Sequence, residues 1–118
     1  MKPARPGITL ETIRKIALAL PEVEERSSYG TPGFFVRKKL FARWHQDGDK
    51  LVVRVEDIAR EAWFRIDPDT YFITDHYRGY PYMLVRHANL TVPALRKVLA
   101  EAWEQAAPPR LRKSLQNR

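Results

Sequence analysis

The segment from His76 to Tyr82 holds the densest group of side chains that could bind a ligand. It reads His-Tyr-Arg-Gly-Tyr-Pro-Tyr, and Gly79 gives the backbone the freedom to turn there. Histidine, arginine and tyrosine together can hold an anion or stack on a planar base. The alternative is that the tyrosines pack their rings at a strand entry and leave their hydroxyls in water. The candidate ligand-binding residues are His76, Tyr77, Arg78, Tyr80 and Tyr82.

Catalytic and metal-binding patterns are weak in the rest of the chain. His45, His76 and His87 have neither HxH nor HxxxH spacing, so a zinc site would need them to converge from separate segments. Ser27-Ser28 lies in no nucleophile elbow, and the five glycines form no phosphate loop. The acidic run Glu22-Val23-Glu24-Glu25 is typical of a solvated connection. We therefore predict that the protein is not an enzyme and has no catalytic residue, metal or cofactor.

A second candidate site lies on the strands that precede this segment. Asp47-Gly48 is a hairpin signal, and a turn there places Trp44 opposite Leu51 and Arg43 opposite Val52. Cross-strand partners share a face of the sheet, so one face is predicted to be the core. Its residues are Phe35, Leu40, Ala42, Trp44, Leu51, Val53 and Val55. The opposite face would then carry Phe34, Val36, Phe41, Arg43, His45, Lys50, Val52 and Arg54.

This opposite face combines cations with flat apolar side chains and contains no acid. Such a surface suits a flexible polyanion, because cations hold phosphates while rings stack on exposed bases. The alternative is an ordinary solvated sheet face, on which long basic side chains cover apolar surface. Two lysines at the preceding turn would extend the patch. The candidate nucleic-acid-binding residues are Lys38, Lys39, Arg43, Lys50, Arg54, Phe34 and Phe41.

Periodicity and capping predict the elements that would position both sites. Thr9 suits a helix N-cap, and an apolar stripe at helical spacing follows it as far as Leu20, before Pro21. A short helix is expected from Glu56 or Asp57 to residue 66, and a final helix is capped by Thr91. Strands are expected over 34–37, 40–45, 50–55, 71–74 and 82–86. The order α-β-β-β-α-β-β-α predicts an α+β fold with an antiparallel sheet and helices packed on one face.

Size and charge limit the class of protein. With 118 residues and no cysteine, the chain suits a single domain over 8–107, predicted to be cytoplasmic, followed by a basic tail over 108–118. A monomer is favoured, and the apolar stretches are too short to cross a membrane. The net charge of +7 favours a polyanionic partner, but cations at the termini are equally typical of a solubilising tail. These terminal cations are Lys2, Arg5, Arg110, Arg112, Lys113 and Arg118.

Three parts of the sequence, in this order and spacing, resemble one protein family. They end a first helix, form a first hairpin, and form a histidine-containing loop with its following strand. The segments are Ala17–Glu25, Gly30–Val36 with Lys39–Ala42, and His76–Tyr80 with Leu84–Arg86. Together they resemble the MmcQ/YjbR family of small bacterial proteins over roughly residues 9–113. The resemblance implies a compact α+β fold related to the frataxin architecture and described as a double wing.

The resemblance also implies a DNA-binding role, which rests on fold analogy, and it supplies no catalytic residue. An acidic, iron-binding first helix of the frataxin kind is not expected, because Glu11 stands there beside Arg14 and Lys15. We predict a module that binds nucleic acid, with DNA favoured, through the basic sheet face and the basic tail. The alternative is a non-enzymatic protein- or small-ligand-binding domain that uses the His76–Tyr82 loop.

Overall fold

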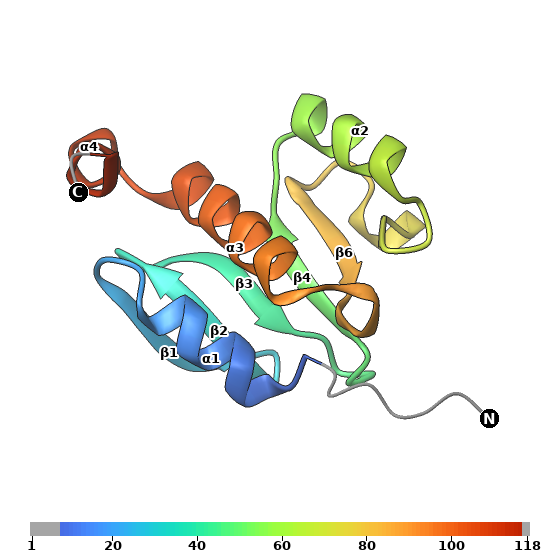
Figure 1. Ribbon diagram of the computed structural model, residues 1–118, viewed down its shortest axis with the longest axis horizontal. Helices are drawn as coiled ribbons and strands as arrows, with labels where there is room; N and C mark the ends of the chain where they lie inside the picture. Colours follow the sequence, from blue (N-terminus) through green and yellow to red (C-terminus); the bar gives the residue numbers. More distant parts are fainter. Residues whose placement is uncertain (1–7, 117–118) are drawn as a thin grey trace.

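Within residues 8–116, which the computed structural model describes, six strands pair in the order β1-β2-β3-β4-β6-β5. Every pairing is antiparallel. The strands are β1 (Val23–Ser28), β2 (Thr31–Val36), β3 (Lys39–Trp44), β4 (Lys50–Arg54), β5 (Tyr71–Phe72) and β6 (Tyr82–Arg86). The helices are α1 (Leu10–Leu18), α2 (Asp57–Ile66), α3 (Val92–Ala106) and α4 (Pro109–Gln116), with short 3-10 helices η1 (Asp75–Tyr77) and η2 (His87–Asn89) (Figure 1). The sequence prediction of an α+β fold is confirmed.

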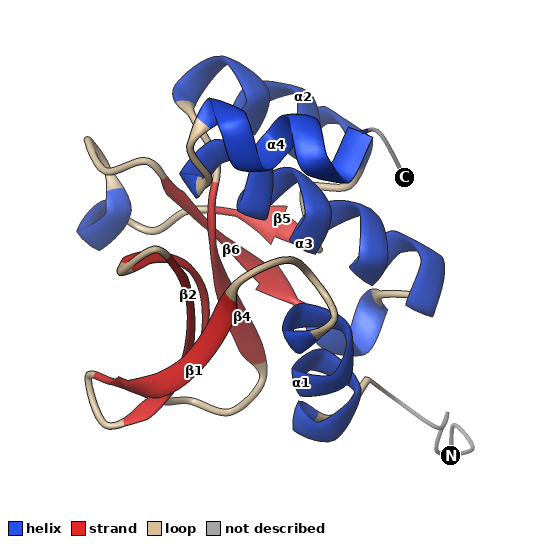
Figure 2. Ribbon diagram, turned by 90° about the vertical axis from the view of Figure 1, so that its left-hand side faces the viewer, coloured by secondary structure: helices blue, strands red, loops and turns tan. Residues whose placement is uncertain are grey.

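The α-helices lie on one side of the sheet (Figure 2). Capping places the starts of α1 and α3 where the sequence predicts them. The Thr9 side chain accepts a hydrogen bond from the Thr12 backbone N–H, and Thr91 accepts one from the Ala94 N–H at 3.2 Å. Helix α3 then runs across the sheet and buries the apolar stripe Leu95, Val98, Leu99, Ala102, Trp103 and Ala106.

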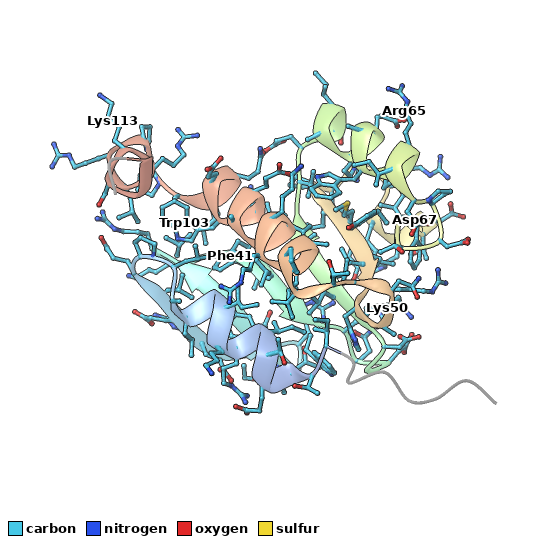
Figure 3. All side chains as sticks on the ribbon, in the orientation of Figure 1. Phe41, Lys50, Arg65, Asp67, Trp103 and Lys113 are labelled. Atoms are coloured by element: carbon cyan, nitrogen blue, oxygen red, sulfur yellow. The ribbon has the colours of Figure 1, made fainter. Side chains whose placement is uncertain are left out.

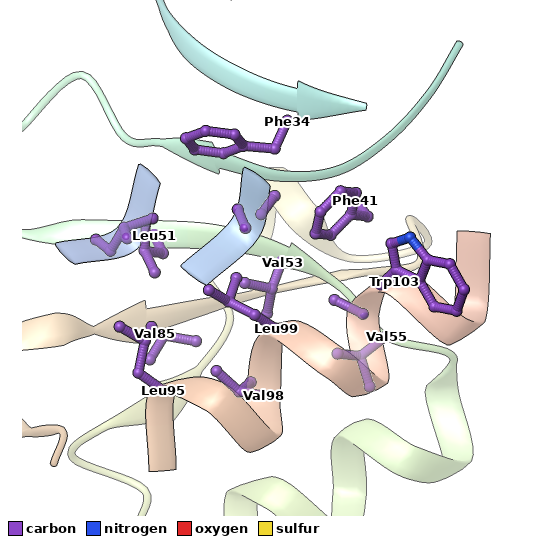
Figure 4. Packing of buried hydrophobic residues seen from close by; sticks show 14 of the residues in the cluster. Phe34, Phe41, Leu51, Val53, Val55, Val85, Leu95, Val98, Leu99 and Trp103 are labelled. Atoms are coloured by element: carbon purple, nitrogen blue, oxygen red, sulfur yellow. The ribbon is translucent and has the colours of Figure 1, made fainter. Parts of the chain in front are cut away.

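The core lies between α3 and the sheet, and its packing is shown in Figure 4. Trp103 is fully buried, and its Nε1–H donates to the carbonyl oxygen of Pro21 at 3.0 Å. Helix α3 therefore also fixes the turn that follows α1. The sheet contributes Phe34, Phe41 and Leu51, each 0% exposed. Side chains of this size each contribute about 1.5–3 kcal/mol on burial.

The predicted register of the β3–β4 hairpin is confirmed. Trp44 pairs with Leu51, and Arg43 pairs with Val52. The connection closes when the His45 N–H donates to the Lys50 carbonyl at 3.0 Å. For residues 42–44 of β3 and 51–53 of β4, the core face and the uncovered face are therefore those that the sequence predicts.

The faces of the β2–β3 hairpin differ from the prediction because of a β-bulge. Phe34 pairs with Ala42 while Phe35 pairs with Leu40, which leaves Phe41 as an extra residue in β3. One extra residue reverses the alternation of side chains along a strand. Phe34, Val36 and Phe41 are consequently 0% exposed in the core, and the prediction that they lie on the uncovered face is wrong. Phe35 and Leu40, predicted to be core residues, are half-buried instead.

Two elements were not predicted from the sequence. Strand β1 occupies the acidic stretch that reads as a connection. Its Glu25 accepts bonds from Arg14 Nε at 2.6 Å and Nη2 at 2.9 Å, which joins β1 to α1. These bonds hold the pKa of Glu25 below its usual range. Helix α4 occupies part of the segment predicted only as a basic tail, and Leu111 packs into the main core.

Candidate functional site

A pocket of about 520 Å³ opens on the sheet face opposite the α-helices. It lies between the β1–β2 turn and the η1 loop, and its floor comes from strands β3, β4 and β6. Four of its lining side chains are tyrosines, so we call it the tyrosine pocket. It is lined by Tyr29, Leu40, Arg43, Gln46, Val52, His76, Tyr77, Tyr80 and Tyr82.

Arg43 is the one arginine or lysine side chain in this lining, and it is 6% exposed. Its Nη2 donates to the Tyr77 hydroxyl at 3.1 Å, and its Nη1 has a contact of 3.3 Å to Gln46 Oε1. Its remaining contacts are longer: 3.4 Å to the Trp44 carbonyl and 3.5 Å to the Thr31 hydroxyl. Arg43, predicted to bind nucleic acid, is therefore buried and bonds only to neutral groups of the protein.

Tyr29 lies over this guanidinium from the β1–β2 turn. The Arg43 Cζ is 5.2 Å from the Tyr29 ring centroid, although Tyr29 is 87% exposed. The turn consists of Tyr29 and Gly30, whose φ angles are +52° and +79°. Turns of this type favour asparagine, aspartate or glycine at both positions, and a bulky side chain with positive φ is strained. The sequence reading missed Tyr29, since nothing in its local pattern shows that this turn faces Arg43.

Arg60 of α2 holds the loop that forms the other wall. It is 8% exposed, and its Nη1 donates to the carbonyl oxygens of Tyr80 at 2.8 Å and Tyr82 at 3.0 Å. A third carbonyl, that of Tyr77, lies at 3.5 Å. Arg60 Nη2 also bonds Asp57 at 2.8 Å. A buried arginine from a helix thus fixes the backbone that presents the tyrosines, and sequence analysis gave no sign of this role.

The structure brings most of the predicted ligand-binding residues together. His76, Tyr77, Tyr80 and Tyr82 all line the pocket. Tyr77 also packs against Val52 and Leu84, so it supports the sheet as well as the pocket. Arg78 is an exception, because it is exposed, pairs with Asp75 at 2.8 Å and does not line the pocket.

The cationic platform predicted across the sheet is not present. Phe34 and Phe41 are buried in the core, as described above, so neither can contact a partner. Lys50 pairs with Asp49 at 2.8 Å and Asp47 at 3.1 Å, and its side chain is 14% exposed. Arg54 donates to the Tyr82 hydroxyl at 3.1 Å and lies 5.5 Å from that ring. The bulge thus buries the two phenylalanines, and side chains of the protein itself bind the two cations that were expected to face a partner.

Lys38 and Lys39 instead belong to a groove between the β2–β3 turn and the α3–α4 junction. This groove has a volume of about 770 Å³, and we call it the basic groove. Its lining is Arg37, Lys38, Lys39, Gln105, Ala106, Ala107, Pro108, Pro109 and Arg112. The terminal cations Lys2, Arg5 and Arg118 lie outside the described residues. Helix α4, which the sequence reading did not predict, brings Arg112 to the lysines.

The turn in this groove is also strained. Arg37 and Lys38 have φ angles of +49° and +70°, although neither is glycine or asparagine. A left-handed backbone costs about 1–2 kcal/mol for such residues. Arg37 pairs with Glu22 at 2.8 Å, and this pair raises the pKa of Arg37 and lowers that of Glu22. Two basic residues thus occupy positions that asparagine and glycine would fill with less strain.

The three histidines do not form a metal site. His45 ends β3, His76 lies in η1, and His87 stacks on Trp44 with ring centroids 4.7 Å apart. Within residues 8–116, no group of three or more histidine, aspartate or glutamate side chains is placed to hold an ion. In the same part of the chain, no helix has the length and apolar character needed to cross a membrane.

His45 lies on the uncovered side of the sheet and is 9% exposed. Burial lowers its pKa, the charges of Lys50 and Arg43 act in the same direction, and Asp47 opposes them. The backbone N–H of Asp47 donates to His45 Nδ1 at 3.1 Å, and this bond needs an unprotonated Nδ1. The folded protein therefore favours the neutral imidazole.

We expect this histidine to make stability depend on pH. An unfolded histidine binds its proton with a pKa of about 6.5, and the folded state binds it less tightly. The free energy of unfolding should then fall as pH drops below about 6.5 toward the folded pKa. Urea unfolding at about pH 7.5 and about pH 5.5 would measure the difference, and His45→Gln should reduce it. An unchanged difference in His45→Gln would assign the effect to other groups.

Comparison with known proteins shows to which family the chain belongs. The model of the YjbR family matches residues 18–105 of the chain. The chain belongs to the YjbR family. The resemblance inferred from the sequence is thereby confirmed. The matched range of this YjbR domain includes the tyrosine pocket and the β2–β3 turn of the basic groove, whereas the groove residues from Ala106 to Arg112 lie beyond it.

The curated relatives match part of their own length. The uncharacterized protein Rv2570 of Mycobacterium tuberculosis H37Rv is 42% identical over 65 residues, which are 54% of this chain and 50% of that protein. The uncharacterized proteins MT2646 of M. tuberculosis CDC 1551 and Mb2600 of M. bovis match to the same extent. The YjbR domain thus spans about half the length of these relatives.

A solved structure resembles the fold. The crystal structure of Deinococcus radiodurans protein DR2400, which has the family domain DUF419, gives a TM-score of 0.73 at 18% identity. The superposition covers 95% of this chain and 91% of that chain. At this identity the likeness shows that the YjbR domain shares the fold.

Proposed function

We propose that this YjbR domain binds nucleic acid, with DNA the favoured target, through the basic groove. The observation that carries the proposal is the gathering of cations from separate segments on one surface. The β2–β3 turn supplies Arg37, Lys38 and Lys39, and α4 supplies Arg112. Arg110 and Lys113 are exposed on the same helix, and Figure 3 shows Lys113 projecting from it.

Three of the cations of this groove are available to a partner, whereas Arg37 pairs with Glu22 at 2.8 Å. None of the ion pairs found among the described residues involves Lys38, Lys39 or Arg112. Nucleic-acid phosphates are bound by such lysine and arginine groups, and this electrostatic term supplies most of non-specific affinity. The groove lining contains no aromatic ring, so contacts to a duplex backbone fit it better than stacking on separated bases.

Binding of this kind depends strongly on salt. If four to six phosphates are neutralised, the logarithm of the association constant should fall with the logarithm of salt concentration with a slope of about −4 to −5. Fluorescence anisotropy of a labelled duplex of about 20 base pairs, titrated with the protein at several salt concentrations, measures this slope. An affinity that does not change with salt would contradict the proposal.

Two charge reversals of equal size distinguish binding at the basic groove from a general effect of the net charge of the protein. Lys38→Glu should weaken binding by about tenfold at low salt and make the slope shallower by about one. Arg65→Glu changes the net charge equally, but Arg65 is exposed on α2, away from Lys113 and α4 (Figure 3). This control should change affinity much less. Equal losses in the two variants would show that no particular surface is used.

A further inference from the structure

We propose that the tyrosine pocket binds a small aromatic acid, with its carboxylate on Arg43 and its ring between tyrosine side chains. This site is separate from the basic groove, because the two share no lining residue. The inference therefore does not depend on the nucleic-acid proposal, and either can fail without the other.

The first argument is the charge of Arg43. Its guanidinium is buried on the pocket lining, and no carboxylate of the described residues lies within 4.0 Å of it. A buried cation is costly unless an anion or strong hydrogen bonds compensate it. The contacts of Nη1 are 3.3 Å or longer, which is beyond the usual length for this type of bond. Nη1 can thus exchange weak neutral partners for a carboxylate oxygen.

The second argument is the shape and chemistry of the walls. Tyr29 and Tyr80 are 87% and 59% exposed, so large parts of their rings are free to contact a ligand. Val52 gives the floor an apolar patch, and His76 lies edge-on to Tyr77 with ring centroids 5.1 Å apart. Tyrosine rings pack against other rings in stacked or edge-on geometry. A volume of about 520 Å³ falls in the range of small-molecule sites.

The third argument is the strain at Tyr29. A tyrosine with φ of +52° in a two-residue turn is less stable than asparagine there, and its ring gains little from burial. Residues held in unfavourable backbone conformations cluster at ligand-binding sites. Placing the Tyr29 ring over Arg43 therefore costs conformational free energy. A ligand that packs against this ring would offset that cost.

The number of cations favours a carboxylate over a phosphate. The lining contains one guanidinium, which can form two parallel hydrogen bonds with a single carboxylate. Arg54 donates to the Tyr82 hydroxyl at 3.1 Å and is not part of the lining. A phosphate dianion would need more donors than this arrangement provides.

The test is binding of phenylacetate and 4-hydroxyphenylacetate, followed by protein NMR on the full chain. Both acids should shift signals of Arg43, Tyr29 and the 75–82 loop. The uncharged analogue phenylacetamide has the same shape and should bind about tenfold more weakly or worse, because it cannot form the charged pair. Phenyl phosphate tests the other anion and should bind more weakly than phenylacetate.

Variants assign the binding to named residues. Arg43→Met should lower the affinity for phenylacetate by about tenfold or more, while Arg78→Met removes an arginine outside the lining and should leave it unchanged. Tyr29→Asn keeps Arg43 and suits the turn, so it should weaken binding in a protein that is at least as stable as the wild type. This variant keeps the test valid if Arg43→Met does not fold.

Three results would overturn the inference. One is equal binding of phenylacetate and phenylacetamide, and another is unchanged affinity in Tyr29→Asn. The third is the absence of any shift at the pocket with millimolar acid. In that last case Arg43 would be a structural residue, satisfied by Tyr77, Tyr29 and its longer contacts within the protein.

Discussion

Replacing Arg37 and Lys38 by asparagine and glycine is expected to stabilise the protein and to weaken its binding to DNA. The wild-type residues have φ angles of +49° and +70°, which Asn-Gly adopts with little strain. The melting temperature should rise by about 4 °C or more, even though the exposed pair between Arg37 and Glu22 is lost. The affinity for a duplex should fall by about a hundredfold at low salt, because two of the cations that line the basic groove are removed.

A matched variant separates position from charge in this experiment. Lys15→Gln with Arg65→Gln removes the same two charges from exposed helical positions and should leave both the melting temperature and the affinity close to wild type. Thermal unfolding and anisotropy on the same preparations measure both quantities. A more stable Asn-Gly variant with full affinity would remove the basic groove as the interface. A fall in melting temperature would contradict the strain argument.

Arg60→Met is expected to lower the free energy of unfolding by about 2–4 kcal/mol and to loosen the wall of the tyrosine pocket. Methionine keeps most of the apolar stem but leaves the carbonyls of Tyr80 and Tyr82 without the donor that lies at 2.8 and 3.0 Å. Urea unfolding measures the stability change. Hydrogen exchange of the amides between residues 75 and 82 should become faster.

The control for this prediction is Asp57→Asn. Asp57 is the ion-pair partner of Arg60, and the Asp57 side chain is 80% exposed. The substitution weakens this pair and leaves the contacts of Arg60 to the carbonyl oxygens in place. The expected loss is about 0.5 kcal/mol. If both variants lose the same stability, the carbonyl contacts are not what fixes the loop.

Local signals in the sequence predicted much of the fold. Asp47-Gly48 gave the correct register for Trp44 and Arg43, and Thr91 marked the start of α3. The bulge at Phe41 could not be predicted in this way, because the alternation of hydrophobic and polar residues does not show where an extra residue lies. The residues of β2 and of the start of β3 were consequently predicted on the wrong face of the sheet.

The candidate sites were predicted only in part, for a related reason. The sequence grouped the residues of the His76–Tyr82 loop because they are contiguous, and four of them line one pocket in the structure. Its partners Tyr29, Arg43 and Arg60 come from distant elements, and only the folded chain brings them to the same loop. The basic groove likewise depends on α4, whose composition is that of a tail.

Strand β1 has a consequence for how copies of the protein meet. An open sheet has two free edges, and an uncovered edge strand can pair with another chain and start aggregation. One edge here is β1, where Glu24 pairs with Arg26 at 2.8 Å and Glu25 is bound by Arg14. The other edge, β5, is only two residues long. The charged side chains that made β1 look like a loop in the sequence thus oppose edge-to-edge association between molecules.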